Sequence, residues 1–87
     1  MASRIDDLSK RIIDLLVQAG HISESETIKS IVRAGEWAVA QCIAIGYIRQ
    51  FKIKITKQDI SDVLYVAKQE EDEQAIEDCQ YLLQKVA

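Results

Sequence analysis

The 87-residue chain is predicted to be all-α, a single small bundle of four to five helices. It contains no proline and only three glycines, and apolar residues recur at spacings of three and four along most of its length. That periodicity is typical of amphipathic helices. Apolar residues make up 48% of the chain and charged residues 29%, the composition of a globular protein. Because a chain this short supports one core, we expect residues 1–87 to form one domain.

The first predicted helix begins near Ser3 and ends at Gly20. Asp6 follows Ser3 at the spacing of a capping box, in which each side chain accepts a hydrogen bond from the other residue's backbone N–H. Glycine after the last apolar position is typical of a helix C-terminus. The apolar positions that share one face are Ile5, Leu8, Ile12, Leu15, Leu16 and Ala19.

The same start signal recurs twice, at Ser23 with Glu26 and at Thr56 with Asp59. We therefore expect further helices to begin at Ser23 and Thr56. Between them, Gly35 precedes a segment that is apolar on most of its circumference and so belongs at the centre of the bundle. Its small residues, which allow close helix packing, are Ala38, Ala40, Ala44 and Gly46. The aromatic residues expected to fill much of the core are Trp37, Tyr47 and Phe51.

Ile53 and Ile55 alternate with Lys52 and Lys54, which predicts a short extended connector with isoleucines inward and lysines toward solvent. The apolar stripe then stays in phase to Val86. One continuous helix over residues 57–86 would be about 45 Å long, which is more than a domain of this size can cover. We therefore expect a break near residues 70–72.

Few residues suit catalysis or metal binding. Cys42 and Cys79 are far apart in the sequence, no Cys-x-x-Cys occurs, and His21 is the one histidine. We expect two buried free thiols in a reducing, cytoplasmic compartment, with no metal site and no cofactor. His21 is interpreted as a loop residue or a helix cap. Because nucleophile and phosphate-loop motifs are also absent from the sequence, we expect a protein that is not an enzyme.

The charge is segregated along the chain. Residues 69–87 hold six acids and one lysine, a net charge of −5, whereas the preceding residues sit at +2. A concentrated acidic field attracts basic surfaces, so these acids are candidate partner-binding residues. Stabilisation by the helix dipole is enough to account for acids near a helix N-terminus. An ordinary solvated helix face remains the alternative to partner binding. The six acids are Glu70, Glu71, Asp72, Glu73, Glu77 and Asp78.

A short basic cluster near Tyr47 and Phe51 raises the question of nucleic-acid binding. Its members are Arg49, Lys52, Lys54 and Lys57. Such binding would work against the acidic segment, so we interpret the cluster as a solvated connector and expect no direct nucleic-acid contact. No run of about 18 uncharged apolar residues occurs, so we expect no membrane insertion.

Residues 30–40, SIVRAGEWAVA, resemble a motif of the Maf-type immunity proteins: an apolar helix end, Gly-Glu-aromatic, two small or apolar residues and alanine. Residues 51–59, FKIKITKQD, are similar to the aromatic, Ile-rich connector and Thr cap that follow in that family. The resemblance covers residues 28–67. Gln41 departs from the pattern, and the tail after Lys68 has no counterpart.

The resemblance implies a small helical antitoxin that protects a bacterium from a polymorphic or contact-dependent growth-inhibition toxin. Such toxins are often nucleases, including uridylate-specific (EndoU-like) endoribonucleases. In this interpretation the six acids block a basic toxin, while Glu36 and Trp37 keep the fold, with Trp37 packed and Glu36 capping a helix or hydrogen-bonded. The alternative is a helical dimerisation or scaffold module of a larger assembly, and a DNA-binding regulator ranks third. The oligomeric state stays open.

Overall fold

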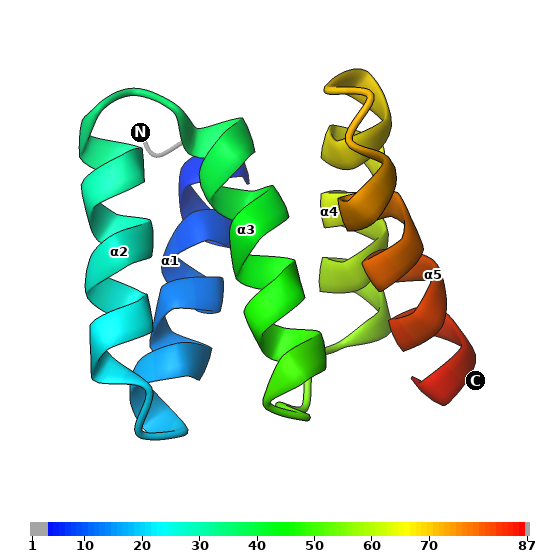
Figure 1. The fold of residues 1–87 in the computed structure, drawn as a ribbon, viewed down its shortest axis with the longest axis horizontal. Helices are drawn as coiled ribbons and strands as arrows, with labels where there is room; N and C mark the ends of the chain where they lie inside the picture. The colour runs from blue at the N-terminus through cyan, green and yellow to red at the C-terminus, as the bar shows by residue number, and fades with distance from the viewer. Residues whose placement is uncertain (1–3, 87) are drawn as a thin grey trace.

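The computed structural model describes residues 4–86, with side chains from Asp7 onward, and this part of the chain is an all-α bundle of five helices and no strands (Figure 1). The helices are α1 (Arg4–Gln18), α2 (Ile22–Arg33), α3 (Trp37–Gln50), α4 (Lys57–Gln69) and α5 (Glu73–Val86). The fold class is therefore confirmed, as is the expected break at residues 70–72. The predicted Ser3–Asp6 cap lies outside the described residues.

Helix α3 occupies the centre, as its apolar circumference predicts. It packs against each of the other four helices, with α1 and α2 on one side and the α4–α5 hairpin on the other (Figure 1). Its small residues make this possible, since Ala40 and Ala44 have no exposed surface. The expectation that aromatic side chains fill the core is wrong, because Trp37, Tyr47 and Phe51 are only half-buried. The largest fully buried side chains are mostly aliphatic, among them Ile12, Leu16, Ile28, Ile45, Ile48, Ile60 and Val63.

All four turns between helices close in the same way, with one residue in the left-handed region of backbone space. In each turn the next backbone N–H donates to the carbonyl five residues earlier, at 2.9 to 3.2 Å, which is the Schellman pattern. Two of these residues are Gly20 and Gly35, as expected for helix ends. The other two are Lys52 (φ 56°) and Glu71 (φ 55°), where a side chain makes this conformation cost about 1 kcal/mol or more.

The tight turn at Gly20 overturns the prediction that the second helix starts at Ser23. The backbone resumes helical geometry at Ile22, with His21 in the N-cap position and no side-chain cap hydrogen bond. Ser23 and Glu26 therefore lie exposed on the first turns of α2. Because α2 begins at Ile22, Ser23 already lies inside the helix and cannot occupy its N-cap position.

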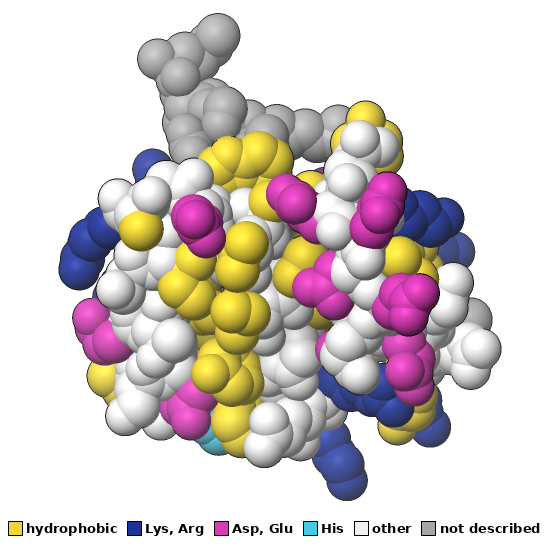
Figure 2. All heavy atoms as spheres, turned by 45° about the horizontal axis from the view of Figure 1, so that its top comes forward, with side chains coloured by type: hydrophobic (Ala, Val, Ile, Leu, Met, Phe, Trp, Pro, Cys, Tyr) yellow, Lys and Arg dark blue, Asp and Glu magenta, His cyan; other side chains and the backbone are white. Residues whose placement is uncertain are grey.

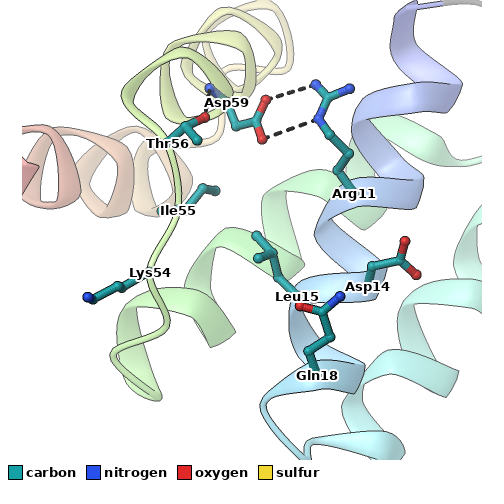
Figure 3. Close-up of a pocket in the computed structure, with 8 residues that line it drawn as sticks. All are labelled: Arg11, Asp14, Leu15, Gln18, Lys54, Ile55, Thr56 and Asp59. Atoms are coloured by element: carbon teal, nitrogen blue, oxygen red, sulfur yellow. Dashed lines mark hydrogen bonds and ion pairs between the residues drawn. The ribbon is translucent and has the colours of Figure 1, made fainter.

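The predicted start at Thr56 is confirmed, but only one half of its capping box forms. The Thr56 hydroxyl accepts a hydrogen bond from the backbone N–H of Asp59 at 3.1 Å. The Asp59 carboxylate does not return the cap, because Arg11 on α1 donates two hydrogen bonds to it, at 2.8 and 3.3 Å (Figure 3). This pair joins α1 to α4 across a hollow of about 500 Å³ and raises the pKa of Arg11 above its ordinary value.

None of the helices in residues 4–86 is both long and apolar enough to cross a bilayer.

Candidate protein-binding surface on α3 and α5

The six acids singled out by sequence do not form one surface. Asp78 is buried and Asp72 is half-buried, so both have turned toward the protein. The exposed acids, here named the acidic face, are Glu70, Glu71, Glu73 and Glu77. Any partner can reach only this smaller set freely.

Asp72 caps the start of α5, where its carboxylate accepts a hydrogen bond from the backbone N–H of Ala75 at 3.1 Å. The Cys42 thiol on α3 lies near this carboxylate. Burial, and secondarily this carboxylate, raises the pKa of Cys42 to about 11. Burial likewise raises the pKa of Cys79 to about 12. Both cysteines are free and buried, which confirms their interpretation as core residues.

Asp78 holds α5 against α3. Its carboxylate accepts hydrogen bonds from Arg49 at 2.9 Å and from Gln74 at 3.2 Å, and the residue is 5% exposed. Gly46 faces this carboxylate, and a Cβ at that position would lie 3.4 Å from it, at the edge of ordinary van der Waals contact. The helical phase contained a signal for this burial, since Asp78 is three residues after Ala75 and four before Leu82, both buried. The prediction that Asp78 is a surface acid did not use this helical phase.

Arg49 is the hub of this contact. Besides Asp78, it lies 3.8 Å from the Glu77 carboxylate and covers the ring of Tyr81 at 4.1 Å from the centroid. The guanidinium therefore contacts both an acid and an aromatic face. Its position over the aromatic ring is a cation–π interaction. Arg49 therefore serves the α3–α5 packing, although the sequence grouped it with a solvated basic cluster.

An apolar stripe runs along the outer side of α3. Val39 is 41% exposed and Ile43 is 38% exposed, and Tyr47 and Phe51 continue the stripe at the four-residue spacing of one helix face. The rings of Tyr47 and Phe51 stack, and the His21 ring lies 3.7 Å from that of Phe51 and nearly parallel to it. His21 is therefore half-buried against an aromatic ring. Its side chain is not free in solvent, as that of an ordinary loop residue would be.

The stripe and the acidic face adjoin. A hollow of about 580 Å³ between α3 and α5 is lined by Tyr47 from the stripe and by Glu77 from the acidic face, with Tyr81 beside them. Figure 2 shows a column of hydrophobic side chains on one face of the molecule, with a group of acidic side chains to the right of this column. Apolar and acidic surface therefore lie together on this side.

Glu36 and Trp37 stand at the start of α3. Glu36 occupies the N-cap position, but its exposed side chain makes no cap hydrogen bond, so the expected capping role is wrong. Trp37 is half-buried and lies outside the group of buried core residues. Glu36 contributes to the Gly35 turn through its backbone N–H, which donates to the Ile31 carbonyl at 3.2 Å.

Within the described residues, no group of three or more histidine, cysteine or acidic side chains could hold a metal ion. The α3–α5 surface offers charge, apolar area and a shallow hollow, which are the elements of a protein-binding surface. Comparisons with protein-family models, with curated proteins and with solved structures found no match to this chain.

Proposed function

We propose that this chain is an immunity protein that neutralises a basic toxin, most simply a nuclease, by binding it through the α3–α5 surface. The observation that carries the proposal is the contact between two kinds of surface. The exposed acid Glu77 of α5 and the half-buried Tyr47, which continues the apolar stripe of α3, line one hollow. Among the described residues, Glu70, Glu71 and Glu73 take part in no ion pair, so their charge is available to a partner.

The two parts of the surface have different physical roles. Exposed like charges accelerate encounter with an oppositely charged partner and disfavour wrong ones, with a strong dependence on salt. Apolar residues such as Val39 and Ile43 provide the desolvated area that most of the binding energy requires. A partner should therefore present basic side chains beside an apolar patch.

A nuclease fits this description because it must present a basic cleft to a phosphate backbone. Carboxylates on a neighbouring protein can occupy such a cleft in place of phosphates and exclude the substrate. The resemblance of residues 30–40 to the Maf-type immunity proteins supports a toxin as the partner. The inhibition mechanism would be steric and electrostatic blockade.

A dimerisation or scaffold module is the second candidate function. The exposed apolar stripe that includes Val39 and Ile43 favours it, because apolar surface of this kind also suits a second copy. Light scattering of the protein alone separates the two functions. A dimerisation module must self-associate in the absence of any partner, whereas an immunity protein needs only to bind its toxin.

The direct test is capture from the source bacterium, with this protein as bait and the neighbouring open reading frames co-expressed, at low and at high salt. We expect a basic toxin fragment that is released as salt rises. A bait that carries Glu73→Lys and Glu77→Lys should capture less of it. Capture of this chain alone, or of a complex indifferent to salt, would contradict the proposal.

A further inference from the structure

A second concave site lies at the other end of α5 from the acidic turn. It is a groove of about 660 Å³ between the connector at residues 52–55 and the last turns of α5. Figure 1 shows this connector and the C-terminal end of α5 at the same end of the molecule, opposite the α4–α5 turn. The groove shares only Arg49 and Tyr81 with the hollow between α3 and α5.

The groove has an apolar floor. Ile55 and Leu82 belong to the buried core, and Ile53 is half-buried and packs against it. Val86, which is 42% exposed, extends the apolar wall toward solvent. Water in contact with such a floor is displaced favourably by an apolar group, at about 25 cal/mol per Å² of surface buried.

The walls of the groove are basic. Arg49 is occupied by Asp78 and Tyr81, but Lys52, Lys54 and Lys85 take part in no ion pair with any residue in the described part of the chain. Two segments bring these three lysines to one groove: the connector contributes two, and the last turn of α5 contributes Lys85. The backbone of Lys52 is fixed in the left-handed turn that ends α3, so its position beside the groove is set by the fold.

We infer that this groove binds a small organic anion with an apolar body, of the alkyl-carboxylate class. Its volume falls within the range of about 300–1,000 Å³ that is typical of small-molecule sites. An apolar floor with a few converging charged groups is the usual composition of such sites. The carboxylate would lie among the three lysines, where charge-assisted hydrogen bonds form, and the alkyl chain would cover Ile53 and Leu82.

The same residues are less suited to nucleic acid. Single strands are held largely by bases that stack on free aromatic faces, whereas the Tyr81 ring is covered by Arg49 at 4.1 Å and approached by Lys85 at 5.3 Å. Phosphate binding would also leave the apolar floor uncovered. The site therefore favours a ligand that combines one or two negative charges with an apolar chain.

The test is a titration of the full chain with decanoate, below its micelle concentration, followed by amide chemical shifts. We expect saturable shifts confined to residues 52–55 and the last turn of α5. Two matched probes separate the contributions: acetate has the charge without the chain, and 1-decanol has the chain without the charge. Both should bind at least about tenfold more weakly than decanoate.

A triple variant tests the lysines. Lys52→Gln, Lys54→Gln and Lys85→Gln together should weaken decanoate binding about tenfold or more. The control variant carries Lys10→Gln, Lys29→Gln and Lys68→Gln, which changes net charge equally at exposed or half-exposed positions away from the groove, and it should bind as the wild type does. All six lysines lie outside the buried core, so both variants should fold, as circular dichroism will show.

Four results would overturn the inference: no saturable shift at the groove, equal binding of 1-decanol and decanoate, equal loss in the two triple variants, or shifts that map to the α3–α5 hollow. A short single-stranded oligonucleotide that shifts the groove amides when decanoate does not would likewise overturn it and indicate a phosphate site. None of these outcomes bears on toxin capture, so the two proposals fail independently.

Discussion

Glu77 and Asp78 are neighbours in the chain and carry the same charge, yet they belong to different parts of the molecule. The Glu77 side chain is 68% exposed and lies 3.8 Å from Arg49, whereas that of Asp78 is 7% exposed and bonds the same guanidinium at 2.9 Å. The inner side of α5 thus uses its acid to hold the fold, and the outer side keeps its acids in solvent. A count of charges does not distinguish these roles, but helical phase does.

Asp72 and Glu73 repeat the same division one helical turn earlier. Asp72 is half-buried and caps α5, while Glu73 is exposed. The inner acids therefore serve the fold, Asp78 by bonding Arg49 of α3 and Asp72 by capping α5, and only the outer acids remain for a partner. Substitutions on the two sides of α5, and chemical labelling of the buried thiols, test this division.

The largest expected effect is on thiol chemistry at the inner side of α5. With the pKa of Cys42 raised by burial to about 11 and that of Cys79 to about 12, the thiolate fraction at pH 8 should be at least about 100-fold below that of the unfolded chain. Iodoacetamide should therefore label the native protein at least about 100-fold more slowly than the denatured protein. Equal labelling rates would mean that the inner side of α5 is open.

The same thiols affect stability at high pH. Their pKa values are raised in the folded state, so folding favours the protonated thiols. This contribution is complete below the ordinary thiol pKa of 9.0 and is lost as pH rises through about 11 to 12. Urea unfolding at a series of pH values should show this loss in the wild type, and Cys42→Ala with Cys79→Ala should remove that part of the slope.

The next effect concerns the ion pair itself. Asp78→Asn keeps the shape and removes the charge opposite Arg49, and we expect a loss of about 2 kcal/mol, less than for a fully buried pair because Arg49 is 30% exposed. Glu77→Gln is the matched control, one residue away, and should cost no more than about 0.5 kcal/mol. Equal losses in urea unfolding would mean that the two acids are equivalent after all.

A smaller effect of opposite sign is expected at the α4–α5 turn. Glu71 holds a positive φ of 55°, which glycine adopts without steric cost, so Glu71→Gly should stabilise the protein by about 1 kcal/mol. Glu70→Gly changes the preceding residue, whose φ of −85° suits any side chain, and should destabilise instead. Thermal unfolding of the two variants distinguishes them, and a loss of stability in both would contradict the account of the turn.

Much of the fold could be predicted from periodicity and punctuation. The absence of proline, the glycines at positions 20 and 35, and the Thr56 cap located most of the helix boundaries. The start of α2 was misplaced because only Ala19, Gly20 and His21 separate the two helices, and the capping-box pattern two residues after His21 was coincidental. Local motifs do not reveal how short a turn can be.

The candidate surface was harder to predict, because it depends on which side of α5 faces α3. In the sequence, Asp78 looks like any of the six acids. Only the structure shows that Gly46 and Arg49 lie opposite it. The burial of Gln41, which donates a hydrogen bond to Ser9 at 3.1 Å, was likewise not predicted. The sequence showed only that Gln41 departs from the pattern of the immunity family. Helical phase indicates that such residues are buried, but it does not identify their partners on distant segments of the chain.

We propose that the outer acids of α5 bind a basic partner while the inner acids hold the fold. The most direct measurement is the association rate of the captured partner with the Glu73→Lys, Glu77→Lys variant, beside a control that carries Asp7→Lys and Asp14→Lys on the exposed side of α1. Both variants change net charge equally and should retain their helicity. The account predicts slow, weakly salt-dependent association for the α5 variant and nearly normal association for the α1 variant. Equal rates for the two would show that only the overall charge matters and would contradict the acidic face as the contact surface.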